Sequence, residues 1–404
     1  MEAHDALIIG GGPAGATAAL LLARAGWSVV LVERQKYPRR KVCGEYLSAT
    51  NWPLFESLGI ADQLAGCAGP PVRDTAVFVG SRVVRAALPL PPRAAMRWGR
   101  ALSREHLDTL LLERAACQGV RVIQPARCSE IRQCGGQFRV QIETAPRHSL
   151  LEVRAGIVIA AHGSWDVGSL PAQRRPRFPS ASDWLAFKAH FRDTGLPAGL
   201  MPLVSFAGGY GGMVHCEGGR ASLSCCIRRS WLGRVARSPG DAAGQAVLAH
   251  MLESCPALRP VLDGAVLDGA WLAAGPIQPG IRPCYAGGLY VLGNAAGEAH
   301  PVVAEGISMA MQSAWLLARL LAAARPRLCD ASIREARIRD AIGRAYTVAW
   351  RRAFAPRIRA AAAIAHWAER PRLVQLVLPA LQARPDLLSW GARLSGKAKL
   401  VATT

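Results

Sequence analysis

Lysine is nearly missing from this chain of 404 residues, since only five lysines stand among 49 Lys and Arg. Acidic residues are also few: Asp and Glu number 28, which leaves a formal net charge of +21 at pH 7. The arginine excess, with abundant alanine and glycine, is typical of biased base composition as much as of selected chemistry. A charge of this size still favours acidic surfaces, either nucleic acid or anionic lipid.

Cysteine pairs at metal-binding spacing are lacking as well. The 11 cysteines include no C-x-x-C pair and their number is odd, which argues against a metal motif and against a secreted disulfide framework. A cleavable leader is not expected either, because a strand pattern already begins at Ala6. These absences predict no metal site and a reduced, cytoplasmic compartment.

An uninterrupted apolar run long enough to cross a membrane is also absent. Polar residues interrupt the longest apolar stretch, 306–324, at Ser308, Gln312, Ser313 and Arg319, so we expect a buried or amphipathic helix there. The composition, 51% hydrophobic and 19% charged, supplies a sizeable core and excludes disorder, collagen and coiled coil as the main state. The length predicts two or three domains.

What the sequence does contain is a glycine motif near its start. The apolar run 6–9 leads into a G-x-G-x-x-G sequence made by Gly10, Gly12 and Gly15, and residues 16–25 then follow a helical pattern. In such a unit the first glycine allows the tight turn and the second lets a pyrophosphate approach the backbone. The third lets the helix pack closely on the strand.

The end of the second strand supports the same interpretation. Glu33 follows the strand 27–32, where an acidic side chain can accept hydrogen bonds from ribose hydroxyls. The helix begins at Pro13 and Ala14, and its N-terminal N–H groups favour phosphate. The motif predicts a dinucleotide site in which Glu33 disfavours NADP, while FAD and NAD remain equal. We add Arg34 to the expected cofactor contacts.

A second glycine motif occurs late in the chain. A strand ends in Gly293-Asn294-Ala295-Ala296-Gly297, Pro301 follows, and a helix begins at Gly306-Ile307. These residues resemble the second flavin motif of the geranylgeranyl reductase-like and para-hydroxybenzoate hydroxylase-like flavoproteins, a superfamily that includes the group A flavoprotein monooxygenases. The resemblance implies FAD, with the helix N-terminus facing the pyrimidine edge of the flavin. It also implies that position 294 bonds the ribityl chain.

The chain departs from that family at position 294, where Asn294 replaces the usual Asp. An asparagine can still accept one hydrogen bond and can also donate, so we expect FAD binding to survive. His162 is a second departure, because many relatives carry Asp in an Asp-Gly pair there. We interpret His162 as a structural replacement, with a gained function as the alternative.

Two further segments carry the resemblance, which covers residues from about 3 to 325. Lys41-Val42-Cys43-Gly44 resembles the K-x-C-G segment of geranylgeranyl reductases, which implies that Cys43 and Gly44 lie along the flavin. Arg104 begins an R-x-x-x-D pattern whose arginine, by the same resemblance, reaches the FAD. We also place Cys128 at the cofactor. Because no second G-x-G-x-x-G follows a strand, NADH or NADPH would bind only transiently, or a partner reductase would replace it.

The predicted fold class is α/β: a Rossmann-like FAD-binding domain with a parallel sheet, an inserted, mainly antiparallel β-sheet substrate domain and a C-terminal helical segment. Residues 1–170 would form the first part of the FAD-binding domain, with a small β excursion at about 66–100. Residues 171–275 would form the substrate domain, 276–325 the last part of the FAD-binding domain, and 326–404 a basic helical region.

Short segments of the sequence support this division. Residues 171–179 form a basic, proline-rich linker. Beyond it, strands are expected at 184–191, 201–206, 209–216 and 220–227, and a helix at 242–253.

Three residues are candidates for the chemistry. His300 lies beside Pro301 in the loop that resembles the flavin-flanking loop, and an imidazole can move a proton near neutral pH; holding the loop backbone is the alternative. Tyr210, among four glycines, either touches substrate or flavin or simply packs in a turn. Cys43 is either a reactive thiol or inert packing. His215 is expected to be a satisfied hydrogen-bonding group.

The prediction is an FAD-dependent oxidoreductase, and several reactions stay open. The first hypothesis is a single-component monooxygenase that hydroxylates a hydrophobic substrate, preferentially an aromatic one, through a flavin peroxide. The second is a reductase of carbon–carbon double bonds in a prenyl or lipid chain, favoured by Lys41-Val42-Cys43-Gly44. A flavin-dependent halogenase is disfavoured because a W-x-W-x-I-P segment is missing. A binding protein that has lost FAD is the non-enzymatic alternative.

The C-terminal region has two interpretations. Arginines interleave there with apolar residues such as Ile358 and Leu376, so this layer either lies on an anionic membrane or forms a solvated helical cap. Nucleic acid is not an expected partner, since the charge is spread along the chain and no nucleic-acid motif occurs.

Overall fold

The strands predicted from the N-terminal sequence meet in one eight-stranded sheet. Along this sheet the order is β17-β18-β10-β1-β2-β7, and the hairpin β8–β9 extends β10. The computed structural model describes residues 2–90, 98–146, 149–164, 168, 173, 177–235, 241–328 and 333–397. The strands are β1 (Glu2–Ile9), β2 (Val29–Val32), β7 (Arg121–Ile123), β8 (Ala126–Cys134), β9 (Gln137–Thr144), β10 (Leu150–Ala160), β17 (Tyr285–Ala286) and β18 (Leu289–Val291).

The core of this sheet is parallel, as its apolar strands predict. β1 pairs in parallel with both β2 and β10, β2 with β7, and β10 with β18. Their carboxyl ends therefore meet along one edge, where ligands of open α/β sheets bind. The predicted domain boundary at residue 170 and most of the linker 171–179 lie outside the described residues.

Helices cover the first sheet and account for the long apolar stretch. They are α1 (Pro13–Arg24), α2 (Trp52–Leu58), α3 (Ala61–Cys67), α4 (Arg104–Cys117), α8 (Gly306–Leu328) and α9 (Ile333–Ala368). Among the described residues, Gly306–Ala324 alone is long and apolar enough to cross a membrane, but 61% of that window is buried inside the protein. Its Met311, Leu317 and Leu321 pack in the core with α1, as the sequence predicts for a buried helix.

The second sheet has seven strands in the order β15-β11-β14-β13-β12-β4-β5. The strands are β4 (Asp74–Val79), β5 (Arg82–Ala87), β11 (Trp184–Arg192), β12 (Leu200–Phe206), β13 (Gly209–His215), β14 (Ala221–Arg228) and β15 (Val266–Ile277). β4 runs parallel to β12, and the other pairs are antiparallel. The four strands expected between residues 184 and 227 are all present.

The small β excursion expected at about 66–100 is the hairpin β4–β5, and it joins the second sheet through the pairing of β4 with β12. An isolated hairpin is marginally stable in water, whereas here Ala76 and Phe78 of β4 join a core with Phe206 and Leu223. The excursion therefore completes the second sheet.

The two faces of the second sheet have different neighbours. Helices α5 (Arg229–Val235), α6 (Asp241–Ser254) and α7 (Arg259–Leu262) accompany it, and α6 closely matches the predicted helix. Phe187 and Phe191 of β11 pack with Val247 and Met251 of α6. Because side chains alternate along a strand, residues 184, 186, 188 and 190 face the other way, where Trp184 and Ala186 pack with Tyr210 and Ile277.

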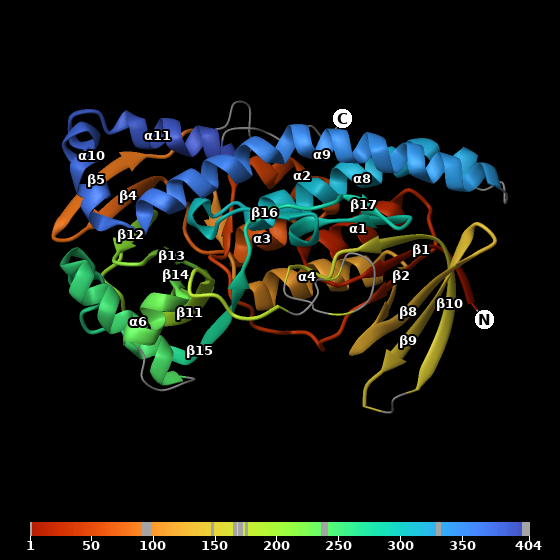
Figure 1. Ribbon diagram of the computed structural model, residues 1–404, viewed down its shortest axis with the longest axis horizontal. Helices are drawn as coiled ribbons and strands as arrows, with labels where there is room; N and C mark the ends of the chain where they lie inside the picture. Colours follow the sequence, from red (N-terminus) through yellow and green to blue (C-terminus); the bar gives the residue numbers. More distant parts are fainter. Residues whose placement is uncertain are drawn as a thin grey trace.

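The C-terminal helices bind the two halves together. Trp350 and Phe354 of α9 lie in the first core, while Ala365 and Ala368 at its end pack with Trp184 near the second sheet. Figure 1 shows α9 running across both halves. Two further helices, α10 (Pro371–Ala383) and α11 (Asp386–Ala392), follow beside β4 and β5.

Short elements complete the described fold. They are the strands β3 (Tyr46–Leu47), β6 (Arg100–Ala101), β16 (Gly280–Ile281) and β19 (Gly297–Glu298), the 3-10 turns η1 (Ala49–Asn51), η2 (Glu217–Gly219), η3 (Pro256–Leu258), η4 (Gly293–Ala295) and η5 (Pro301–Val303), and a π-turn, η6 (Arg393–Lys397).

Candidate functional site

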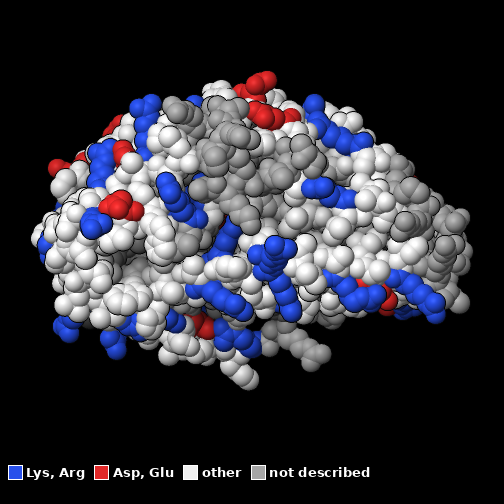
Figure 2. Space-filling model, turned by 90° about the horizontal axis from the view of Figure 1, so that it is seen from above, with Lys and Arg blue, Asp and Glu red and all other residues white. Residues whose placement is uncertain are grey.

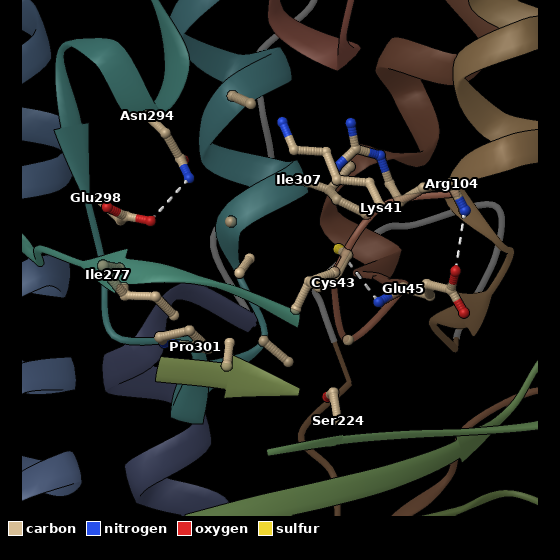
Figure 3. Close-up of a pocket in the computed structure, with 18 of the residues that line it drawn as sticks. Lys41, Cys43, Glu45, Arg104, Ser224, Ile277, Asn294, Glu298, Pro301 and Ile307 are labelled. Carbon is tan, nitrogen blue, oxygen red and sulfur yellow. Dashed lines mark hydrogen bonds between the residues drawn. The ribbon is translucent and has the colours of Figure 1, made fainter. Parts of the chain in front are cut away.

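A cavity of about 920 Å³ lies between the carboxyl edge of the first sheet and the inner face of the second. It brings together most of the residues chosen from sequence. Those that line it are Gly10, Gly12, Pro13, Ala14, Glu33, Arg34, Cys43, Gly44, Arg104, Cys128, Tyr210, Asn294, Pro301, Gly306 and Ile307. These residues come from opposite ends of the chain, so the fold assembles one site from separate motifs (Figure 3).

The glycine motif forms a cradle suited to a pyrophosphate. Gly10 has a φ of +106°, and a Cβ there would lie 2.6 Å from the Ala161 carbonyl oxygen. A Cβ on Gly15 would collide with the Gly10 carbonyl, which explains the close approach of helix to strand. Gly12 differs, because a Cβ there would meet only the Arg104 guanidinium, at 3.6 Å. Gly12 thus leaves space beside the N-terminus of α1, where phosphate is favoured.

Glu33 is held in place by backbone donors. Its Oε2 accepts a hydrogen bond from the Gly11 N–H at 2.7 Å, and its Oε1 accepts one from the Gln35 N–H at 2.9 Å. The carboxylate is buried and lines the cavity. Its remaining lone pairs can accept ribose hydroxyls, so the cradle and Glu33 together fit the adenosine half of FAD.

Cationic side chains border the same cradle. Arg104 donates from Nε and Nη2 to the two Asp108 oxygens at 2.7 and 2.6 Å. Burial lowers the pKa of Arg104, but the Asp108 carboxylate outweighs it and raises that pKa. Burial and the charges of Arg104 and Arg39 lower the pKa of Lys41 to about 8. The site therefore concentrates positive charge where phosphates would bind (Figure 3).

The second glycine motif lies at another wall of the cavity, with a carboxylate beside its asparagine. Asn294 Nδ2 donates to Glu298 Oε1 at 3.3 Å, and Ser164 Oγ donates to the same oxygen at 3.0 Å. A Cβ on Gly306 would meet nothing within 4 Å, so the N-terminus of α8 opens toward the cavity. The charge that Asn294 lacks is present nearby on Glu298, a residue that the sequence analysis did not select.

A buried ionic cluster beside the cavity was also missed. Glu45, which has a φ of +61°, accepts a hydrogen bond from the Arg104 backbone N–H at 3.0 Å. Its carboxylate pairs with Lys188 Nζ and, at 2.8 Å, with His190 Nε2. Burial would raise the pKa of Glu45, but the His190 hydrogen bond and the Lys188 charge lower it to about 2. One signal was available: Lys188 and His190 stand two residues apart in an otherwise mostly apolar strand.

This cluster is an ion pair and not a metal centre. Glu45, His190 and Cys216 each offer a ligand atom, and these atoms lie within 4.8 Å of one another. Both Glu45 oxygens already have partners, and one of them is the cation of Lys188. A second positive charge would therefore be repelled.

His300 and Tyr210 are brought together, but on the sheet side of the site. Tyr210 Oη lies 3.0 Å from His300 Nδ1, and both rings contact Trp184. Within the described part of the chain, Tyr210 lines the cavity and His300 does not. Burial and the charge of Arg228 lower the pKa of His300 to about 4, so it is neutral near pH 7. His300 thus contacts Tyr210 outside the cavity lining, and the proton-transfer role expected of it stays a prediction.

Each of the remaining candidates has a defined contact. Cys43 lines the cavity, and its Sγ accepts the Glu45 N–H at 3.4 Å. His215 bonds the Leu196 carbonyl at 2.8 Å, as predicted for a satisfied histidine. His162 lines the cavity and bonds the Gly163 carbonyl at 2.9 Å. Its interpretation as a structural replacement stays a prediction.

The cradle makes a direct prediction. We expect Gly12→Ala to fold normally, because the added Cβ meets only Arg104 at 3.6 Å, but to weaken FAD binding about tenfold by occupying phosphate space. Quenching of FAD fluorescence by the apoprotein measures this. The control is Gly66→Ala in α3, where a Cβ meets nothing within 4 Å. Equal affinity of both variants for FAD would contradict the assignment.

Comparisons with known proteins agree with this site. A family model described as FAD binding domain matches residues 3–331. The 6-methylpretetramide 4-monooxygenase of Streptomyces rimosus is 26% identical over 348 residues, which are 81% of this chain and 75% of that protein. Digeranylgeranylglycerophospholipid reductase 1 of Methanothermobacter thermautotrophicus is 28% identical over 336 residues, 79% of this chain and 77% of that protein.

A solved structure is similar over nearly the whole fold. The flavin-dependent brominase Bmp2 superposes with a TM-score of 0.75 at 19% identity, covering 98% of this chain and 94% of that one. At this identity the likeness extends to the fold alone. The similar proteins thus share an architecture, while their names cover monooxygenation, reduction and bromination.

Proposed function

This chain belongs to the FAD binding domain family and is an FAD-dependent oxidoreductase, and on that premise we propose that it is a single-component monooxygenase. Its substrate in this proposal is hydrophobic, with an aromatic ring preferred. The similarity to 6-methylpretetramide 4-monooxygenase over 81% of the chain supports a monooxygenase. The observation that carries the proposal is the wall of the cavity opposite the FAD cradle.

That wall is apolar and belongs to the second sheet. The apolar residues that line the cavity there include Val77, Leu88, Met201, Leu203, Tyr210 and Val214. Such a surface binds an apolar molecule by removing it from water, at roughly 25 cal/mol per Å² of apolar surface buried. Because the same cavity also contains the glycine cradle, a substrate on this wall would lie against a bound cofactor.

Different residues of the chain would bind different parts of FAD. The N-terminus of α1 and Arg104 would hold the pyrophosphate, Glu33 the ribose, and the N-terminus of α8 the flavin edge. Bound FAD supplies two-electron redox chemistry and, once reduced, reactivity toward oxygen. Burial raises the pKa of Tyr210 well above its ordinary value, so its hydroxyl stays protonated and orients polar groups without titrating. The apolar wall excludes water from the reacting centre.

The source of electrons is part of the proposal. NADH or NADPH would bind transiently at the open side of the cavity, or a partner reductase would supply the electrons. Mixing the oxidised enzyme with each nicotinamide under anaerobic conditions, and following the loss of flavin absorbance, distinguishes these sources.

Two observations favour a second reaction, reduction of a carbon–carbon double bond in a prenyl or lipid chain. The chain is 28% identical to a digeranylgeranylglycerophospholipid reductase, and Cys43 and Gly44, in the segment that prompted this hypothesis, line the cavity. For a halogenase, the similarity to the brominase concerns fold alone. The two leading reactions differ in their need for oxygen.

Rapid mixing tests the monooxygenase directly. The FAD-loaded enzyme is reduced anaerobically and mixed with oxygenated buffer, with and without a panel of polycyclic aromatic compounds. We expect a transient absorbing species before the oxidised spectrum returns, and oxygen-dependent product from at least one aromatic compound. Turnover of an unsaturated prenyl lipid at the same rate without oxygen would overturn the proposal. Free reduced FAD is the control for uncatalysed reoxidation.

A further inference from the structure

The outer surface of α10 carries exposed apolar residues beside the exposed Arg372, Gln375 and Gln382. The inner side of this helix is accounted for, since Val374 and Leu378 pack with Val77 and Val79 of the second sheet. The opposite side carries Leu376, whose side chain is 76% exposed. Val377, Pro379, Ala380 and Ala383 are also exposed. Exposed apolar side chains gathered on one helix point to a further apolar surface beside the protein.

The next helix also carries exposed apolar residues. In α11, Trp390 is 60% exposed and Leu387 is 44% exposed. We call the exposed apolar residues Leu376, Val377, Leu387 and Trp390 the α10–α11 surface. Figure 1 places both helices at the outside of the molecule, beside β4 and β5.

Cations flank the α10–α11 surface. The exposed charged residues of the segment 370–393 are Arg370, Arg372, Arg384, Asp386 and Arg393. The segment therefore exposes four positive charges and one negative charge. Figure 2, which views the molecule from the side of α9 and α11, shows many more cationic than acidic side chains over this face. An apolar strip with arginines at its borders complements a bilayer whose headgroups are anionic.

The same helix borders the cavity. Leu388, Gly391 and Ala392 of α11 line the cavity, and so does the exposed Leu387. Because Leu387 is both exposed and part of the lining, the cavity reaches the surface beside it. A molecule dissolved in lipid would therefore meet the entrance next to the α10–α11 surface.

From these contacts we propose that the α10–α11 surface docks the protein on an anionic lipid bilayer. Trp390 and Leu376 enter the interfacial layer, and the neighbouring arginines face the headgroups. Docking brings the cavity entrance at Leu387 to the membrane, which suits a lipophilic substrate. The surface does not depend on which redox reaction the cavity performs.

Sedimentation with vesicles tests this docking. We expect the FAD-loaded full chain to sediment with vesicles of equal parts phosphatidylcholine and phosphatidylglycerol, and to bind pure phosphatidylcholine much more weakly. The variant Leu376→Gln/Trp390→Gln is expected to lose about tenfold or more in binding, since each side chain buries apolar surface in lipid. Raising NaCl to about 1 M, where the Debye length is about 3 Å, weakens binding of the unaltered protein.

A matched control and a second readout keep the test specific. Leu150→Gln changes a comparably exposed leucine at the start of β10, remote from α11 in Figure 1, and is expected to bind as the unaltered protein does. Brominated acyl chains are expected to quench tryptophan fluorescence less in Trp390→Gln. No binding to the anionic vesicles, or equal binding by the double variant, would overturn the proposal. A dimer in light scattering that becomes a monomer in the double variant would overturn it too, in favour of an interface between two copies.

Discussion

Glu45→Gln lowers the melting temperature of the protein by on the order of 5 °C or more, because it leaves Lys188 without a counter-charge. The side chains of both residues are about 1% exposed. Removing one partner of a buried pair costs about 3–5 kcal/mol. Circular dichroism at 222 nm during heating measures the change, with saturating FAD in every sample.

The pairing itself, and not the position, is responsible for this loss. If so, the double variant Glu45→Gln/Lys188→Met recovers a large part of the stability, because no unpaired charge remains in the interior. Arg132→Met on the exposed hairpin controls for loss of a charge, since that side chain is 69% exposed. A melting temperature for Glu45→Gln within a degree of the unaltered protein would show that the cluster contributes nothing.

The same pair predicts how stability varies with pH. The pKa of Glu45 in the folded protein is about 2, below its ordinary value of 4.5, so folding favours the ionised form. The stabilisation, about 3 kcal/mol from that difference, is complete above about pH 4.5 and is lost as the pH falls toward 2. The gap in melting temperature between Glu45→Gln and the unaltered protein therefore closes over this range.

The sequence predicted which glycines and which carboxylate lie together at one end of the cavity, for a physical reason. Phosphate cradles depend on backbone geometry, and backbone geometry shows in the sequence as glycines at fixed spacing. Gly10, Gly12 and Glu33 accordingly line one cavity, and Gly15 packs against the Gly10 carbonyl. The α/β class and the parallel sheet followed from the apolar strands around those glycines.

The substrate half could not be predicted in the same way. Its wall is built from strands that are far apart in the sequence. β4 pairs with β12, which lies 126 residues further along the chain, and no sequence motif indicates this pairing. The period-two pattern of β11 did carry information, because it sets Lys188 and His190 on one face. Their partner Glu45 is 143 residues away, so the cluster became visible only in three dimensions.

The direction of the His300 ring could not be predicted either. The sequence favours His300 for proton transfer because its loop resembles the flavin-flanking loop and an imidazole can move a proton near neutral pH. The ring turns to Tyr210 and Trp184. Side-chain direction at a loop depends on packing from the second sheet, which local sequence does not encode.

Removing the Arg104 guanidinium is expected to have the largest effect on cofactor binding. In Arg104→Met the charge beside Gly12 disappears, and we expect FAD affinity to fall about 100-fold, because a charge-assisted bond to phosphate is worth roughly 1.5–3 kcal/mol. Titration of the apoprotein with FAD, followed by fluorescence, gives the dissociation constant. Arg132→Met again serves as the control for charge.

The single variant Arg104→Met also destabilises the fold, because Asp108 is fully buried and loses its bidentate partner. Arg39 Nη2, 3.9 Å from an Asp108 oxygen, replaces only part of that interaction. The double variant Arg104→Met/Asp108→Leu removes both charges together, so the interior holds no unpaired carboxylate and the fold is expected to be retained. If Arg104 binds the cofactor, this folded double variant still has the weakened FAD affinity. If its dissociation constant for FAD equals that of the unaltered protein, Arg104 serves only to neutralise Asp108, and the pyrophosphate must rely on the N-terminus of α1 alone.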